Sequence, residues 1–446
     1  MTPPLAELLA RRRDVYVGWL KEACAIPSHA GDPEGLDAMR AWLAQRLAAV
    51  GAEVEIVPAG DAPAAVFAQA SAGERTLLLY GHYDVEPPGS LAAWSSPPFA
   101  AAERDGRIVA RGAADNKGDL VARIAALDAL AAAGGLPVAV KLLVEGAEET
   151  GSPGLADVVA RLGGRLAADG CVWEGAGRDG DGRPLVQLGV KGMLAVELRC
   201  RSHGEEMHSG FAGLVESPAW RLVQALASLR DADGRVRIAG FYDDVAPPSE
   251  QERRLLDRYP LSTGAPGEPA DRDEVAALFG APTCNVSAIR TSGGDVPHRC
   301  IVPTEAAADV DLRLVPGQDP RTVLDRLRVH LRAGGFDDVE VLPWTLEPAV
   351  SGPPDSALAR AVARAAERTF GQPPVVAPRS PGTGPLAALA TVAGPVVEPP
   401  GVWRPDANIH APDESCRIDD FLAAIAWTAD CLQQFASLDA PPGAPA

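Results

Sequence analysis

Short apolar runs of strand length alternate with longer stretches of helical periodicity along the first part of this 446-residue chain. Thr76–Tyr80 (TLLLY) is apolar apart from its first residue and ends at a glycine, as expected of a strand buried on both faces. Apolar residues recur at helical spacing within Asp119–Ala133, and Val138–Val144 and Val172-Trp173 predict further strands. This alternation predicts an α/β fold, with helices covering both faces of a mainly parallel sheet.

The middle of the chain has a different order of elements, β-α-β-β-α-β, which is typical of a ferredoxin-like α+β unit. Its halves are separated by Asp243–Asp273, which is rich in proline and charged residues and predicts a long surface excursion. The predicted elements are Met193–Arg201, Ser217–Leu229, Cys284–Ile289, Ala306–Val315, Asp319–Ala333 and Val339–Leu342.

The helical spacing of apolar residues that is typical of the first part of the chain resumes at Asp355–Phe370. We therefore predict a catalytic α/β domain in two parts, 1–189 and 351–438, interrupted by an inserted α+β domain at 190–350. The Pro/Ala-rich tail, 439–446, is expected to be disordered.

Charge and cysteine usage exclude several classes of protein. The formal net charge of -19 argues against nucleic acid or anionic membranes as partners. No apolar run is long enough for a transmembrane helix, and the amphipathic N-terminal stretch lacks the features of a signal peptide. The seven cysteines include no CxxC pair, which favours free thiols over a disulfide framework. These features together predict a cytoplasmic protein.

Five polar motifs follow predicted strands or precede predicted helices, and in parallel sheets the carboxyl ends of the strands form the ligand site. Alone, each motif also fits a hydrogen-bonded histidine, a helix cap or a solvated acidic turn. Together they supply two histidines and four or five carboxylates, a ligand set that suits Zn2+, Mn2+ or Co2+ better than Ca2+ or Mg2+. The motifs are GHYDV at 81–85, RGAADNKG at 111–118, EGAEETG at 145–151, VWE at 172–174 and NIHAPDE at 408–414.

With HSG at 208–210 and RLVPGQDP at 313–320, these motifs resemble the two-metal amidohydrolases typified by aminoacylase, carnosinase, glutamate carboxypeptidase and succinyl-diaminopimelate desuccinylase. The dipeptidase-like branch is the most similar, because of the long inserted segment and FYDDVAPPSEQE at 241–252. The resemblance extends from the N-terminal helix to about Phe435. It implies that the inserted domain is a lid and a dimerisation domain.

The resemblance implies two divalent metal ions, most simply Zn2+, with Mn2+ or Co2+ as alternatives. Asp115 would bridge both ions, and its peptide bond to Asn116 would be cis. The remaining ligands would be His82 and Glu174 for the first ion and Glu149 and His410 for the second.

The same resemblance assigns the catalytic residues. Glu148 would be the general base that deprotonates a water bridging the two metals, which gives hydroxide near neutral pH. Asp84 would orient His82. His208 would reach across a homodimer and help to stabilise the oxyanion in the partner's active site.

Substrate contacts are implied on the inserted domain and on one loop. Arg313 would clasp the substrate carboxylate, although it could instead pair with Asp311 or Asp309. Asn285 would contact the substrate or the oxyanion. The loop at 378–385, with Thr383 and Gly384, and the segment at 398–406 are more proline-rich than is usual in the family; Arg379, Trp403 and Arg404 there are either ordinary loop residues or determinants of specificity.

The expected function is metal-dependent hydrolysis of dipeptides or short peptides with a free C-terminal carboxylate. An N-acyl or N-carbamoyl amino-acid amidohydrolase on the same site is the alternative. A non-catalytic binding protein is disfavoured because no ligand position is lost. A nucleotide-binding enzyme is disfavoured because no GxGxxG or P-loop occurs at a strand–helix turn.

Overall fold

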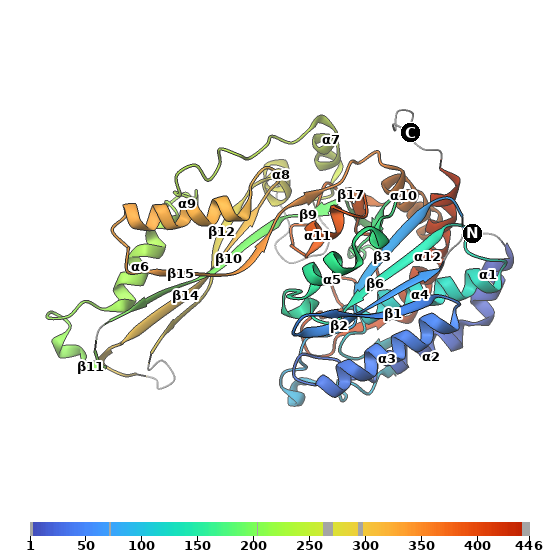
Figure 1. Ribbon diagram of the computed structural model, residues 1–446, viewed down its shortest axis with the longest axis horizontal. Coiled ribbons are helices and arrows are strands. Elements are labelled where there is room, and N and C mark those ends of the chain that lie inside the picture. Colours follow the sequence, from blue (N-terminus) through green and yellow to red (C-terminus); the bar gives the residue numbers. More distant parts are fainter. Residues whose placement is uncertain (1–2, 71–72, 203, 262–270, 293–297, 439–446) are drawn as a thin grey trace.

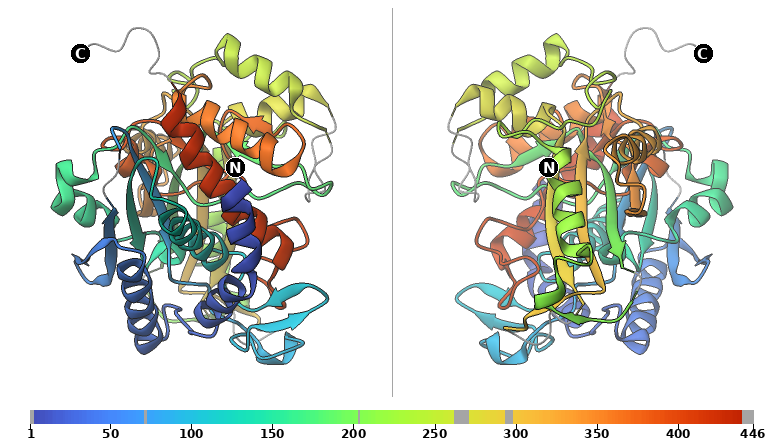
Figure 2. Two further views of the ribbon diagram at one scale, coloured as in Figure 1. Left: turned by 90° about the vertical axis from the view of Figure 1, so that its right-hand side faces the viewer. Right: turned by 90° about the vertical axis from the view of Figure 1, so that its left-hand side faces the viewer.

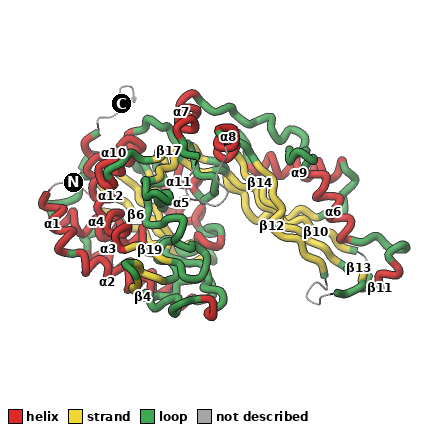
Figure 3. The backbone as a smooth tube through the Cα atoms, turned by 180° about the vertical axis from the view of Figure 1, so that it is seen from behind, coloured by secondary structure: helices red, strands yellow, loops and turns green. Residues whose placement is uncertain are grey.

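The computed structural model describes residues 3–70, 73–202, 204–261, 271–292 and 298–438. Within these ranges the chain forms two bodies side by side, an α/β body that contains both termini and a slimmer body that projects from it (Figures 1 and 3). The tail at 439–446, which the composition predicts to be disordered, lies outside the described residues. No helix of the described ranges is long and apolar enough to span a membrane.

A six-stranded sheet forms the centre of the larger body, and the predicted α/β class is confirmed. The four strands β6, β3, β7 and β18 are parallel, whereas β1 and β2 are antiparallel at one edge. The antiparallel edge arises because only Gly60 and Asp61 separate these two strands, and so short a connection permits only a hairpin. In spatial order the strands are β1 (Glu53–Ala59), β2 (Ala62–Ala70), β6 (Ala139–Glu145), β3 (Thr76–His82), β7 (Cys171–Val172) and β18 (Val396–Val397).

Alternate residues of β3 belong to two hydrophobic cores, one on each face of the sheet. Leu77 and Leu79 pack with the helices of one face, and Leu78 and Tyr80 with those of the other. The predicted single N-terminal helix is two helices, α1 and α2, and Figure 2 shows α1 beside the C-terminal helix α12. The first face carries α1 (Pro3–Arg11), α2 (Arg13–Cys24), α3 (Pro33–Ala49), α4 (Lys117–Ala132), α10 (Ala357–Phe370) and α12 (Ile418–Ser437), and the second α5 (Leu155–Leu162) and α11 (Leu386–Ala390).

The inserted domain has the predicted ferredoxin-like arrangement, a four-stranded antiparallel sheet in the order β12-β14-β10-β15. Helices α6 (Pro218–Leu229) and α9 (Pro320–Ala333) pack on one face of this sheet, where Leu194, Leu312 and Leu327 are fully buried. The opposite face carries polar side chains such as Arg313. The elements are β10 (Gly192–Arg201), α6 (Pro218–Leu229), β12 (Thr283–Thr291), β14 (Glu305–Leu314), α9 (Pro320–Ala333) and β15 (Glu340–Glu347).

The segment predicted as a surface excursion contains helix α7 (Glu250–Arg258) and leads into α8 (Arg272–Gly280). Leu256, Val275 and Phe279 of these helices form a small buried cluster with Ala377, the last residue of β17 (Val375–Ala377). Among the described residues of 243–273 only Leu256 is buried, so the predicted surface position is confirmed, whereas helix α7 was not predicted. Charged residues dominate the composition, and they conceal the few apolar residues that face inward.

Two short strands, β9 (Gly189–Val190) and β16 (Val350–Ser351), pair where the chain leaves the larger body and returns to it. This pairing supports the division at 189/190 and 350/351, which we retain as a proposal. The remaining strands form three small sheets. They are β8 (Leu185–Gln187) with β17 (Val375–Ala377), β11 (Met207–His208) with β13 (Ile301–Val302), and β19 (Ser415–Arg417) with β5 (Arg107–Val109) and β4 (Ala102–Arg104).

Candidate metal centre

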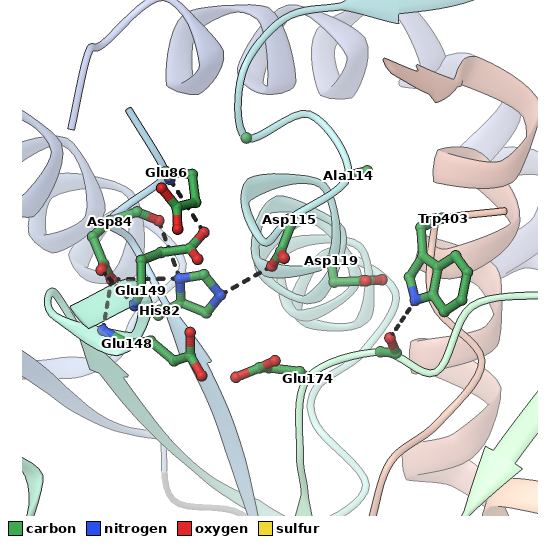
Figure 4. A network of polar contacts seen from close by, with 12 residues as sticks. His82, Asp84, Glu86, Ala114, Asp115, Asp119, Glu148, Glu149, Glu174 and Trp403 are labelled. Atoms are coloured by element: carbon green, nitrogen blue, oxygen red, sulfur yellow. Dashed lines mark hydrogen bonds and ion pairs between the residues drawn. The ribbon is translucent and has the colours of Figure 1, made fainter. Parts of the chain in front are cut away.

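Histidines and carboxylates from five separate segments meet at the carboxyl edge of the parallel strands. Figure 4 shows His82 of this group with the carboxylates that surround it. Parallel strands end at the same edge, so residues distant in sequence meet there. His82 is the last residue of β3, Glu148 and Glu149 lie on the turn after β6, and Glu174 follows β7. Asp115 directly precedes α4, and His410 lies in the loop before β19.

The carboxylate of Asp115 faces two imidazole rings, one from each end of the chain. Its Oδ1 lies 3.2 Å from His82 Nε2, and its Oδ2 lies 3.2 Å from His410 Nε2. The peptide bond between Asp115 and Asn116 is cis, as the resemblance implied. One carboxylate with each oxygen directed at a different histidine is the arrangement required to bridge two cations.

Asp84 contacts both His82 and the turn that carries the paired glutamates. His82 Nδ1 lies 3.1 Å from the Asp84 backbone oxygen and 3.4 Å from its carboxylate. The same carboxylate accepts hydrogen bonds from the backbone N–H groups of Glu148 and Glu149, at 3.2 and 3.0 Å. Asp84 therefore fixes the ring of His82 relative to both glutamates.

Two groups of three side chains bring their possible ligand atoms within 4.8 Å of one another. The first group is His82, Asp115 and Glu174, and the second is Glu86, Glu149 and His410. The sequence reasoning missed Glu86, whose backbone N–H also donates to Glu149 Oε1 at 3.2 Å. Its position two residues after Asp84 in the same extended stretch was the available signal.

Burial and mutual repulsion perturb the carboxylates. Burial raises the pKa of Glu148 to about 8, reinforced by Asp115 and Glu149 and opposed by His82. Burial, followed by repulsion from Glu148, raises the pKa of Glu174 well above its usual value. Hydrogen bonds with Asp115 and Glu149 raise the pKa of His410 to about 10.

Glu174 Oε1 is buried and has no hydrogen-bond partner among the described residues. A buried carboxylate oxygen without a donor is costly unless a cation satisfies it. The histidine and carboxylate donors also have the chemistry that zinc and similar ions prefer. The residues present therefore fit a pair of divalent cations.

Glu414 holds the turn that precedes α4 in place, a role that the sequence reasoning did not assign. Its carboxylate is fully buried and contacts Arg111 Nη1 at 2.7 Å. It also accepts hydrogen bonds from the backbone N–H groups of Gly112, Ala114 and Asp115, at 2.9 to 3.0 Å. The acid two residues after Pro412 in the last motif was the signal that could have identified it.

The predicted carboxylate-binding residue, Arg313, extends from the open face of the inserted sheet to the larger body. Its Nη1 donates to Thr383 Oγ1 at 2.8 Å, whereas its Nε lies 3.9 Å from Asp311. Thr383 in turn donates to the Lys191 backbone oxygen at 2.8 Å. Gly384 lies against the Trp173 ring, where a Cβ atom would come within 2.6 Å of it. The other predicted partner of Arg313, Asp309, pairs with Arg290 instead.

Two predicted site residues are not brought to the centre within this chain. Asn285, on β12, is exposed and donates to Asp311 Oδ2 at 2.9 Å. His208, in β11, is exposed at the end of the inserted domain farthest from the larger body (Figure 1).

The proline-rich loop residues have structural partners. Trp403 Nε1 donates to the Gly175 backbone oxygen at 2.8 Å, as Figure 4 shows. Arg404 Nε donates to Asp420 Oδ2 of α12 at 2.6 Å. Of the two readings left open for these residues, the contacts favour anchoring of the loop.

Comparison with known proteins identifies one family, described as peptidase family M20/M25/M40, whose model matches residues 78–434. The chain is 30% identical to mouse Beta-Ala-His dipeptidase over 353 residues, which cover 72% of this chain and 71% of the mouse protein. It is 26% identical to a Cys-Gly metallodipeptidase of Schizosaccharomyces pombe, over 73% of this chain and 75% of that protein.

Solved structures give a similar picture. An M20 family metallo-carboxypeptidase from Sulfolobus solfataricus superposes with a TM-score of 0.88 at 35% identity, covering 98% of this chain and all of that one. Human carnosine dipeptidase 1 superposes with a TM-score of 0.83 at 25% identity, again over 98% of this chain and 100% of the other.

Proposed function

The chain belongs to peptidase family M20/M25/M40, and from this premise we propose that it hydrolyses dipeptides or short peptides with a free C-terminal carboxylate. It is a metal-dependent peptidase. The observation that carries the proposal is the carboxylate of Asp115 between His82 and His410, with Glu148 beside it. The dipeptidases among its relatives favour this reaction over hydrolysis of N-acyl or N-carbamoyl amino acids.

Two divalent cations would be held by the side chains that meet at the carboxyl edge of the sheet, and we propose Zn2+ as their identity. When bound, such ions supply Lewis acidity for a water molecule and for the peptide carbonyl. The proposed ligands are His82, Asp115 and Glu174 for one ion and Asp115, Glu149 and His410 for the other.

Glu148 is the proposed general base. It lies beside the ligand Glu149, and the backbone N–H groups of both are held by Asp84. The raised pKa of Glu148, which follows first from burial, suits a group that accepts a proton from water and returns it to the leaving nitrogen. A divalent cation nearby would favour its ionised form at neutral pH.

Hydrolysis of a panel tests the proposal. Metal-reconstituted protein should cleave dipeptides faster than N-acetyl or N-carbamoyl amino acids, with release of the two amino acids measured by chromatography. A preference for the N-acyl or N-carbamoyl compounds would reverse the proposed substrate class.

Replacing Arg313 by alanine is expected to lower kcat/KM for a free dipeptide by two to three decades, or about 2–4 kcal/mol, through loss of a charge-assisted contact with the carboxylate. Hydrolysis of the corresponding dipeptide amide should change little. Arg290→Ala is the matched control, because Arg290 lies on the neighbouring strand and pairs with Asp309 and Glu197. An unchanged preference for the free acid in Arg313→Ala would assign carboxylate recognition to another residue.

We further propose a homodimer formed by the inserted domain, in which His208 serves the partner's active site. Two features support it. Strand β12 is an edge strand, and the exposed side chains on this domain include Trp220, Ile289 and Trp344, of which Trp220 is 69% exposed. Asn285, also on β12, would then contact the substrate or the oxyanion.

A cytoplasmic location is proposed from the free cysteines, six of them buried.

Mixing inactive His208→Ala subunits with inactive Glu148→Gln subunits should restore part of the activity, because each mixed dimer contains one complete site. Sedimentation measures the oligomeric state, and the mixture is assayed after subunit exchange. A monomer with full activity would exclude this arrangement.

A further inference from the structure

Arg379 directly precedes residues 380–383, of which Thr383 contacts Arg313, and its own side chain is only 4% exposed. Its Nε donates to Ser351 Oγ at 3.0 Å and its Nη1 to the Phe279 backbone oxygen at 2.8 Å. Its Nη2 donates to Glu252 Oε1. All three donor nitrogens of this guanidinium are therefore used within the fold.

Glu252 joins Arg379 to the start of helix α7. Its Oε2 accepts a hydrogen bond from the Ser249 backbone N–H at 2.8 Å, and the Ser249 hydroxyl accepts one from the Glu252 N–H at 3.1 Å. This reciprocal pair is a capping box. One carboxylate oxygen thus caps the helix while the other binds Arg379.

Helices α7 and α8 form a small unit packed against β17, the strand that directly precedes the same loop. Leu256 and Phe279 bury against Ala377, two residues before Arg379, and Tyr259 packs edge-on against Phe279 with ring centroids 4.7 Å apart. Arg272 of α8 also donates to the Leu256 backbone oxygen at 3.1 Å. This unit is fixed to the end of β17, from which the loop begins.

A second buried cation extends the same support to the other side of the loop. Lys191 Nζ donates to the Ala281 backbone oxygen just after α8, at 2.7 Å. The Lys191 backbone N–H donates to the backbone oxygens of Ser380 and Gly382, at 3.1 and 3.0 Å. Its backbone oxygen accepts from Thr383, the residue that receives Arg313.

We propose that the α7–α8 unit, acting through Glu252 and Arg379, positions the loop at 380–383 and thereby the carboxylate-binding group Arg313. Arg379 and Glu252 are positioning residues and do not touch the substrate. The proposal rests on the function proposed above, in which Arg313 receives the C-terminal carboxylate. It predicts that specificity for a free C-terminus depends on a helix pair outside the metal centre.

The test compares a dipeptide with its C-terminal amide, the amide being followed as a substrate or as a competitive inhibitor. Glu252→Gln and Arg379→Lys should each raise KM for the free acid by about 10–100-fold, because a small displacement of a binding group has effects of this size. The kcat for the free acid, the constants for the amide and the content of two metals should change little. Glu250→Gln is the control, since Glu250 lies on the same helix and its one ion pair among the described residues is with the exposed Arg254.

A purely structural role would lower the active fraction and reduce turnover of both compounds equally, which would overturn the proposal. An unchanged ratio of acid to amide in both folded variants would overturn it as well. In an Arg313→Ala background, Arg379→Lys should have no further effect on the ratio, because the group that it positions is absent. A wild-type protein that cleaves no dipeptide would instead refute the proposed function itself.

Discussion

Replacing Glu148 by glutamine is expected to lower kcat by about 10²–10⁴-fold while both metal ions stay bound. The amide preserves the size of the side chain but cannot accept the proton of water. Substrate binding should be retained, because Glu148 is not among the proposed ligands. Steady-state kinetics and elemental analysis of the same preparation measure the two effects.

The neighbouring substitution Glu149→Gln is the matched comparison. Glu149 Oε2 lies 3.1 Å from His410 Nε2, whereas Glu148 has no such contact with either histidine among the described hydrogen bonds and ion pairs. Glu149→Gln should therefore reduce metal occupancy first, and added metal should recover part of the activity. If Glu148→Gln lost metal and Glu149→Gln did not, the two roles would have to be exchanged.

Replacing Asp115 by alanine should remove metal from both positions and nearly all activity with it. Each oxygen of its carboxylate faces a different histidine at 3.2 Å, so a single substitution affects both halves of the centre. Elemental analysis should find neither ion tightly bound. Two retained ions would refute the bridging role.

The Glu86→Gln variant tests whether Asp115 or Glu86 completes the second group of metal ligands. Glu86 lies near Glu149 and His410, so it could complete the second group in place of Asp115. If Asp115 is the bridge, Glu86→Gln should keep both ions and most of the activity. Loss of one ion alone in this variant would make Glu86 a ligand of the second position.

The main architecture was predictable because the sequence contains both apolar runs of strand length and apolar residues at helical spacing. The apolar run at Thr76–Tyr80 and the helical spacing at Asp119–Ala133 correspond to β3 and α4, with changes of a few residues at their ends. The β-α-β-β-α-β order along the chain correctly predicted the ferredoxin-like arrangement of the inserted domain. The meeting of His82 with Glu149 and Glu174 was also predictable, because these residues end or follow parallel strands that share one carboxyl edge.

Other features depend on three-dimensional contacts that leave little trace in a local pattern. The charged surface of α7 conceals Leu256, and no periodicity links Glu252 to Arg379, 127 residues later. The role of Glu414 depends on four contacts with a turn about 300 residues earlier. The proposed role of His208 requires a second copy of the chain, which a single sequence does not describe.

The dependence of Asp115 on Glu414 has a consequence for biosynthesis. The turn that carries Asp115 is translated early, but the carboxylate that holds it and the histidine that faces it are translated near the end. Folding during synthesis proceeds from the N-terminus, so the early α/β segments exist for some time without these partners. A nascent chain, or a copy interrupted before His410, therefore contains every other proposed ligand yet has no complete centre. If the proposed ligand set is correct, peptide cleavage is expected to begin only after nearly the whole polypeptide has been made.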